Sequence, residues 1–167
     1  MPARSSAGVR GQPSLTSGRI ERRTFVLATP REAWAALHDP ACEASLFSEF
    51  ALGPAEPAWP AAGSTRLARF RYGLLRDPVL LESLEARPGR SFRVRFLGTD
   101  VYGEIGWLFE PASGGTRVVH QLVIQPVDRW GRILSALERR SVADHADAHL
   151  DQLKAVVEGR AAAGGSP

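Results

Sequence analysis

The feature that most constrains the fold is an amphipathic pattern near the end of the chain. Apolar side chains recur there at spacings of four, four, three and four residues, in the order Val142, Ala146, Leu150, Leu153 and Val157. At 3.6 residues per turn, this spacing places all of them on one face of an α-helix. Such a helix is stable when its apolar face is covered. We therefore expect a long C-terminal helix that packs against a surface built by the preceding chain.

Strand-like segments between about residues 64 and 126 supply such a surface. Apolar and polar residues alternate in them, and turns at Pro88-Gly89 and Ser113-Gly114-Gly115 separate neighbouring segments. Alternation with a period of two gives a sheet one apolar and one polar face, as in an antiparallel meander with one solvated side. Asp77-Pro78 predicts a further break. The expected strands cover about residues 20–28, 64–72, 79–86, 92–96, 101–110 and 116–125.

Two short helices are expected between the first strand and the others. Thr29 can accept a hydrogen bond from a free helical amide, Pro30 suits the first helical position, and Glu32 can complete a capping box. The first helix should end before Pro40, because the residue that precedes a proline avoids helical geometry. A second short helix is expected over about residues 41–50.

Composition and charge narrow the class of protein. A chain of 167 residues with 44% apolar side chains can bury one sizeable core, so we expect one domain. The net charge of +3 comes mostly from arginines that are spread among Asp and Glu, which argues against a nucleic-acid partner. Cys42 is the single cysteine, which excludes an internal disulfide and a cysteine metal site and fits a reducing compartment.

The ends of the chain differ from its middle. Residues 1–18 are rich in Ser, Gly, Pro, Ala and Arg and lack a secretory apolar core, so we expect a disordered leader before a domain at residues 19–159. Residues 160–167 predict a flexible tail. No segment approaches the ~20 apolar residues of a membrane span, so we expect no membrane insertion and a cytoplasmic protein. The sequence leaves open whether the chain forms a homodimer.

Three segments stand out beside the order of these elements, namely FVLATPREAWAALHDP (Phe25 to Pro40), YGEIGWLFEPASGGTRVVHQL (Tyr102 to Leu122) and HLDQLKAVVEGR (His149 to Arg160). Together with that order they resemble the helix-grip fold of the SRPBCC superfamily, which includes START-type lipid carriers and polyketide cyclase/dehydrase-like bacterial proteins. The resemblance covers roughly residues 19–159, and the joint order of elements is more specific than any short motif. It implies an α+β fold in which a curved antiparallel sheet of about six to seven strands wraps around the C-terminal helix.

The resemblance also implies a mostly apolar cavity between sheet and helix. Small-molecule sites of this kind usually enclose several hundred Å³ and combine apolar walls with a few polar groups. The alternative is that the same side chains simply fill the interior. The residues expected to face a ligand are Phe70, Tyr72, Phe92, Val94, Phe96, Ile105, Trp107, Val118, His120, Leu122 and His149.

Two of these residues are candidates for a catalytic or ligand-orienting role. An inward imidazole at His120 could orient a ligand or move a proton, or it could be a satisfied structural residue. The hydroxyl of Tyr72 could bind a ligand carbonyl or phenol, or it could reach solvent. His145 and His149 have the spacing of metal ligands on a helix, but the sequence shows no third ligand. We therefore expect neither a metal nor another cofactor.

Three functions follow from these features. The first is binding of a hydrophobic small molecule, such as a polyketide-, lipid- or isoprenoid-like compound, which needs only the cavity. The second is an enzyme of the cyclase, aromatase or dehydratase kind, which needs at least two polar groups that converge inside the cavity. The third is a protein-interaction module resembling the Hsp90-activator branch, which needs an exposed apolar patch. Whether the protein is an enzyme is left open.

Overall fold

A computed structural model describes residues 19–40, 42–43, 49–72, 75–99, 101–126 and 129–164 of the chain. Within these ranges, the side chains at positions 72, 75, 126, 129–141 and 160–164 lie outside the description. The expected leader at residues 1–18 therefore falls outside the described residues. So does the side chain of Tyr72.

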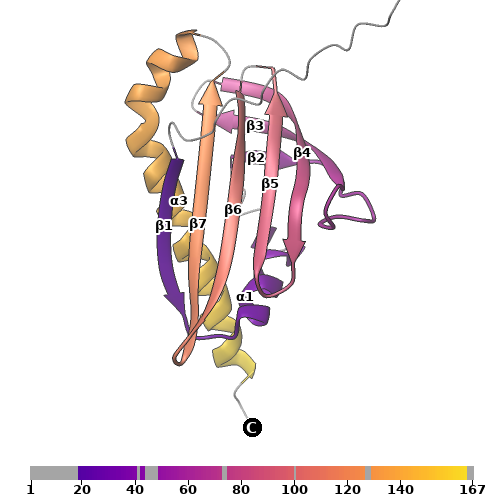
Figure 1. The fold of residues 1–167 in the computed structure, drawn as a ribbon, viewed down its shortest axis with the longest axis vertical. Helices are drawn as coiled ribbons and strands as arrows, with labels where there is room; N and C mark the ends of the chain where they lie inside the picture. The colour runs from indigo at the N-terminus through magenta and orange to yellow at the C-terminus, as the bar shows by residue number, and fades with distance from the viewer. Residues whose placement is uncertain are drawn as a thin grey trace, which may run out of the picture.

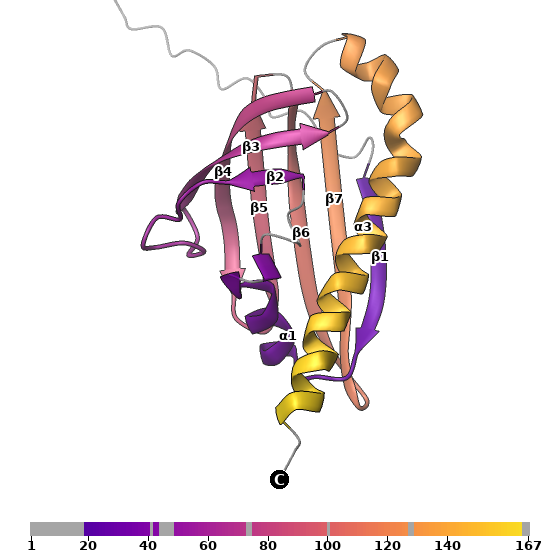
Figure 2. The same ribbon diagram turned by 180° about the vertical axis from the view of Figure 1, so that it is seen from behind.

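The described chain forms a seven-stranded antiparallel sheet with strand order β1-β7-β6-β5-β4-β3-β2. The sheet is strongly curved, so that β2 and β3 run across the upright strands β5, β6 and β7 (Figure 2). This confirms the expected α+β helix-grip fold and its curved antiparallel sheet. The strands are β1 (Arg19–Val26), β2 (Phe50–Leu52), β3 (Thr65–Tyr72), β4 (Leu75–Arg87), β5 (Ser91–Gly98), β6 (Val101–Ala112) and β7 (Gly115–Pro126).

Helix α3 (Arg129–Gly164) lies across one face of the sheet, beside β1 and β7 (Figures 1 and 2). It contains the whole predicted segment and continues to Gly164, beyond the expected domain end at residue 159. The apolar stripe faces the sheet, since Ala146 and Leu153 are fully buried and Leu150 and Val157 nearly so. No helix in the described ranges is long and apolar enough to cross a membrane.

Helix α1 (Pro30–Leu37) begins as the sequence predicts. The Thr29 hydroxyl accepts a hydrogen bond from the Glu32 amide at 3.3 Å, and a Glu32 carboxylate oxygen accepts one from the Thr29 amide at 2.8 Å. This is the predicted capping box. Of the second expected helix, Cys42 and Glu43 are helical, while residues 41 and 44–48 lie outside the described part.

Two boundaries predicted from the sequence are wrong. Phe50 does not end a helix but begins β2, where it pairs with Phe70. Asp77-Pro78 does not break the chain, because β4 continues through it and Pro78 pairs with Arg69 of β3. The described pairing of β4 with β5 begins only at Val79, so the missing amide hydrogen of Pro78 leaves no partner in β5 unpaired.

Candidate functional site

The candidate site is a narrow hollow between the concave face of the sheet and α3. Its volume is about 10 Å³, close to the least space that one water molecule requires. The wall is apolar except where the turn before β2 and helix α3 contribute ionisable side chains. The lining residues are Glu49, Phe50, Phe70, Phe96, Ile105, Leu122, Ile124, Val142, His145 and His149.

Three phenylalanine rings form the sheet side of this hollow. The ring of Phe50 lies 5.3 Å from that of Phe70 and 5.4 Å from that of Phe96, measured between centroids. The rings of Phe70 and Phe96 are stacked, with 6.0 Å between centroids. Phe50 of β2 is paired directly with Phe70 of β3. Phe96 of β5 lies level with Leu81 and Arg66 in the strand register, so it is the curvature of the sheet that brings its ring to the other two.

The structure divides the residues that were expected to face a ligand. Phe70, Phe96, Ile105, Leu122 and His149 line the hollow. The remaining described ones are fully or almost fully buried in the core and do not line this hollow, namely Phe92, Val94, Trp107, Val118 and His120. The hollow is also far smaller than the cavity that the resemblance implied. Along the chain between the lining residues Ile124 and Val142, the side chains at positions 126 and 129–141 lie outside the described residues.

Glu49 is the polar lining residue that sequence reasoning missed. It occupies a turn directly before β2, in a segment that was expected to be helical. A carboxylate between the apolar Phe47 and Phe50 was the sign available in the sequence. Its burial then follows from the tertiary fold, because β2 folds back onto β3 and carries Glu49 toward α3.

A chain of buried polar contacts runs from the sheet to Glu49. His120 Nδ1 lies 3.2 Å from the carbonyl oxygen of Gly106, and His120 Nε2 lies 3.2 Å from His149 Nδ1. His149 Nε2 in turn lies 3.1 Å from Glu49 Oε1. The His120 ring stacks on the ring of Trp107, with centroids 3.9 Å apart. These contacts bring together two of the predicted polar residues and add Glu49.

The hydrogen-bonding partners fix the protons on both imidazoles. A carbonyl oxygen only accepts, so His120 Nδ1 must donate to Gly106. Burial, and secondarily the charge of His149, lowers the pKa of His120 to about 3. His120 is therefore neutral near pH 7, and its bare Nε2 accepts a hydrogen bond from His149 Nδ1. This leaves His149 Nε2 as the nitrogen that faces Glu49.

Glu49 is ionised although it is buried. Burial raises the pKa of this carboxyl, but the hydrogen bond and charge of His149, a backbone hydrogen bond and the charge of His145 together outweigh burial, so that the net pKa lies below its ordinary value. The 3.1 Å contact is short enough for an ion pair, yet neither Glu49 Oε1 nor His149 Nε2 has a hydrogen bond of regular geometry within the described residues.

His145 stands on α3 one turn before His149. Its Nε2 lies 4.0 Å from Glu49 Oε1, and its side chain is 40% exposed. Thus a third residue does join the histidine pair whose spacing suggested metal ligands. Within the described residues, however, no three such side chains lie in an arrangement that could hold a metal ion.

A second buried charged group lies beneath residues 53–63. Arg66 Nη1 donates to Glu43 Oε2 at 2.7 Å, and Arg66 Nε donates to the Gly53 carbonyl at 2.7 Å. Trp59 Nε1 donates to the other Glu43 oxygen at 3.1 Å. Because the charged atoms of this group have partners of good geometry, we assign it the structural role of holding this loop against the sheet.

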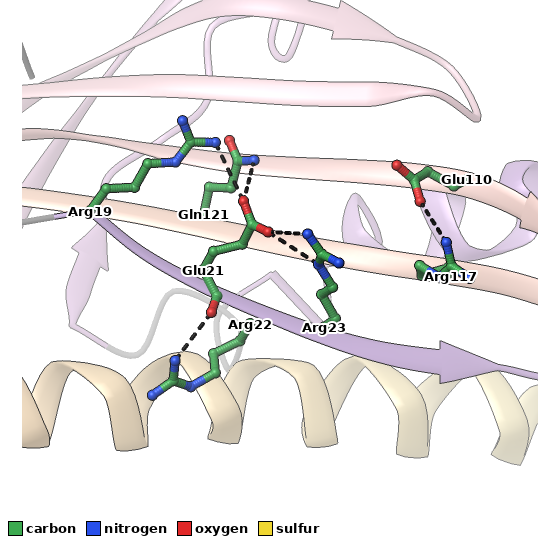
Figure 3. Close-up of polar contacts among 7 residues, drawn as sticks. All are labelled: Arg19, Glu21, Arg22, Arg23, Glu110, Arg117 and Gln121. Atoms are coloured by element: carbon green, nitrogen blue, oxygen red, sulfur yellow. Dashed lines mark hydrogen bonds and ion pairs between the residues drawn. The ribbon is translucent and has the colours of Figure 1, made fainter. Parts of the chain in front are cut away.

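The outer face of the sheet carries paired charges over most of its width. Figure 3 shows Glu21 between Arg19, Arg23 and Gln121, and Arg117 beside Glu110. The arginines of β5 are paired too, as Arg95 contacts Glu82 and Arg93 contacts Glu104. This distribution is typical of a solvated face.

One part of the outer face is apolar. Leu67 of β3 is paired with Leu80 of β4, which is paired with Leu97 of β5, so the three form a row across neighbouring strands. They are 69%, 37% and 40% exposed. An open groove of about 540 Å³ adjoins Leu67 and is bordered by arginines such as Arg69 and Arg71. It is larger than the hollow, but it is open, whereas small-molecule sites bury most of their ligand.

Comparison with known proteins agrees with the fold. A family model described as polyketide cyclase/dehydrase and lipid transport matches residues 17–158. The protein TTHA0849 from Thermus thermophilus has a similar structure, with a TM-score of 0.67 at 19% identity over 85% of this chain and 98% of that one. CV1439 from Chromobacterium violaceum gives a TM-score of 0.63 at 18% identity over 84% and 98% of the two chains.

A third similar structure is that of a protein from a biosynthetic pathway. It is the di-domain ARO/CYC StfQ from the steffimycin biosynthetic pathway, with a TM-score of 0.69 at 16% identity over 87% of this chain and 52% of that one. No curated protein sequence matches the chain. The family match covers most of the sequence and confirms the expected SRPBCC resemblance. The chain therefore belongs to the polyketide cyclase/dehydrase and lipid transport family.

Proposed function

We propose that this protein binds a hydrophobic small molecule between the concave face of the sheet and α3. The observation that carries the proposal is an apolar hollow whose polar groups are gathered at one place, around Glu49 and His149. Membership of the family supports a ligand-binding or cyclase role. An apolar wall with a few converging polar groups is the usual form of such sites.

The size of the hollow sets a requirement on binding. A volume of about 10 Å³ admits no ligand larger than about one water molecule, so entry of a larger molecule must move lining side chains apart. The aromatic rings of Phe50, Phe70 and Phe96 meet on one side of the hollow, and α3 forms the other. A ligand would therefore enter by separating α3 from these rings, or by separating Phe50 of β2 from Phe70 and Phe96.

Binding of the neutral fluorescent probe N-phenyl-1-naphthylamine tests the proposal. Ile105→Phe adds a ring at the wall of the hollow and should weaken probe binding by at least about tenfold. Leu67→Ser removes an apolar side chain from the outer face and should leave the dissociation constant unchanged. The circular dichroism spectra of both variants establish that they are folded. If Leu67→Ser abolishes binding and Ile105→Phe does not, the probe binds outside and the proposal fails.

A cyclase- or dehydratase-like enzyme is the second candidate function. The observation that favours it is that Glu49 and His149 converge on the hollow, with His120 behind them. An enzyme of this kind needs at least two polar groups at its substrate, and general acid–base catalysis is the chemistry that a carboxylate and an imidazole supply. Turnover of a candidate polyketide substrate, lost in Glu49→Gln while binding is retained, would establish it over a carrier.

A further inference from the structure

We infer that the open groove on the outer face of β2, β3 and β4 binds an acidic, extended segment of a partner protein, which places an apolar side chain beside its carboxylates. This basic groove is bordered by Leu67, Arg69, Arg71 and Arg76. It lies on the face of the sheet opposite to α3, so the inference goes beyond the proposed function and does not depend on the ligand site in the hollow.

Positive charge is concentrated in the basic groove. Three of its described lining residues are arginines, and the others are all uncharged. Arg71 of β3 stands directly opposite Arg76 of β4, and Arg69 lies two residues away on the same strand. Like charges at directly opposed positions destabilise the pairing of two strands. Neither Arg69 nor Arg71 forms an ion pair with another described residue.

Arginines elsewhere on this face of the sheet are balanced by carboxylates. Those of β5 and β7 each contact a glutamate on a neighbouring strand, in the pairs Arg93–Glu104, Arg95–Glu82 and Arg117–Glu110, the last of which is drawn in Figure 3. The basic groove departs from this arrangement. A local departure of this kind is expected at a functional surface, where a partner supplies the missing charge.

Leu67 adds an apolar contact at the border of the basic groove. It is 69% exposed, the highest value among the exposed large apolar side chains of the described chain. The row of Leu67, Leu80 and Leu97 continues this apolar surface away from the arginines. A partner that covers Leu67 removes apolar surface from water, which favours association. The partner is therefore expected to present an apolar side chain as well as carboxylates.

The geometry of β3 sets the spacing of these groups in the partner. Leu67, Arg69 and Arg71 point to the same face, since alternate residues of a strand do so. At about 3.3 Å per residue, Leu67 and Arg71 lie roughly 13 Å apart along the strand. An extended segment lying along β3 has the same spacing between its own alternate residues. The complementary pattern is an apolar residue with acidic residues two and four positions away, toward either end of the segment.

Other occupants fit the basic groove less well. A second copy of this chain placed face to face would bring two sets of arginines together, and these repel each other. Proteins that bind single-stranded nucleic acid stack the bases on aromatic side chains, whereas none of the described lining residues is aromatic. An anionic membrane presents a flat surface, whereas these arginines border a concave one.

Amide NMR of the nitrogen-15-labelled full-length protein, titrated with the peptide SLSESES, tests the inference. The peptide is acetylated and amidated, so that only its two glutamates carry charge. We expect saturable shifts at Leu67, Arg69 and Arg71, and an affinity that falls as salt is added, because exposed ion pairs are screened. The peptide SLSQSQS should bind about tenfold more weakly, since each exposed ion pair contributes a factor of about two to five. Equal binding of the two peptides would overturn the inference.

Two double variants with the same loss of charge locate the binding surface. Arg69→Gln with Arg71→Gln should weaken binding of SLSESES about tenfold. Arg93→Gln with Arg117→Gln removes two paired arginines from the same face and should leave the dissociation constant unchanged. Dispersed amide spectra establish that both variants are folded.

Two further results of these experiments would contradict the inference. The first is equal weakening by the two double variants, or no saturable shift at the basic groove. The second is binding to equimolar vesicles of phosphatidylcholine and phosphatidylglycerol that depends on Arg69 and Arg71, without binding of the peptide. The partner would then be an anionic membrane.

Discussion

At the scale of single residues, burial determines the charge of His38. Burial lowers the pKa of His38 to about 4, although Glu43 acts in the opposite direction. The His38 ring lies 4.1 Å from that of Trp34 and 4.5 Å from that of Phe92, between centroids. Within the described residues its Nε2 has no hydrogen-bond partner. His38 is therefore a neutral, partly buried residue at pH 7.

This state makes stability depend on pH. A histidine in the unfolded chain binds a proton below a pH of about 6.5, whereas folded His38 binds one only below about 4. Between these values the unfolded state holds more protons, so the free energy of unfolding decreases as the pH falls through this window. We expect His38 to account for a loss of about 3 kcal/mol between pH 6.5 and pH 4.

Urea unfolding at several pH values measures this effect. His38→Leu should reduce the pH dependence of the free energy of unfolding below pH 6.5. Above pH 7 this free energy should vary with pH equally in the two proteins. His120, whose pKa is about 3, should continue to contribute in the variant. Identical slopes for the two proteins between pH 4 and pH 6.5 would contradict the assignment of His38.

Most inward residues could be predicted from the sequence because a strand fixes the direction of alternate side chains. Once Phe96 was placed inward, Val94 and Phe92 had to follow, and the structure buries all three. The alternation could not reveal which inward residues border the hollow, since this depends on the curvature of the sheet. It could not reveal the contact between Glu49 and His149 either, because their positions are far apart along the chain.

At the scale of elements, one of the two glycines in β6 allows neighbouring strands to pack closely. A Cβ atom added at Gly103 would lie 1.9 Å from the carbonyl oxygen of Val123 and 2.5 Å from the ring of Phe96. The same atom at Gly106 would have its nearest neighbour at 3.5 Å, an ordinary contact. Gly103 therefore makes room for the Phe96 ring that lines the hollow.

This difference predicts opposite outcomes for two alanine substitutions in one strand. Gly103→Ala should lower the free energy of unfolding by about 1–3 kcal/mol or more, because β7 and the Phe96 ring must both move. Gly106→Ala should change it by less than about 1 kcal/mol, and a small gain is expected from the stiffer unfolded chain. Thermal and chemical unfolding give both values. Equal losses at the two sites would show that the close packing at Gly103 is not as described.

The elements that the sequence predicted best are those with a local cause. The capping box at Thr29 and Glu32 depends on residues three apart, so the start of α1 could be read directly. The continuation of β4 through Pro78 depends on where β5 ends, and the strand at Phe50 depends on pairing with β3. Both are decided by partners distant in sequence, which local patterns do not show.

At the scale of the whole molecule, one helix closes a curved sheet and encloses the candidate site. The apolar stripe of α3 covers the concave face, and the opposite face of the sheet carries paired charges and the row of Leu67, Leu80 and Leu97. The central claim is that a ligand enters between the sheet and α3. The row of leucines on the outer face is the alternative apolar surface against which this claim must be tested.

Methyl NMR of isoleucine- and leucine-labelled protein, titrated with 2-naphthol, tests this claim most directly. The account predicts shifts and ligand-to-methyl nuclear Overhauser effects at Ile105 and Ile124, which line the hollow, with no change at the outer leucines. Shifts confined to Leu67, Leu80 and Leu97, with Ile105 and Ile124 unchanged at saturating ligand, would contradict it.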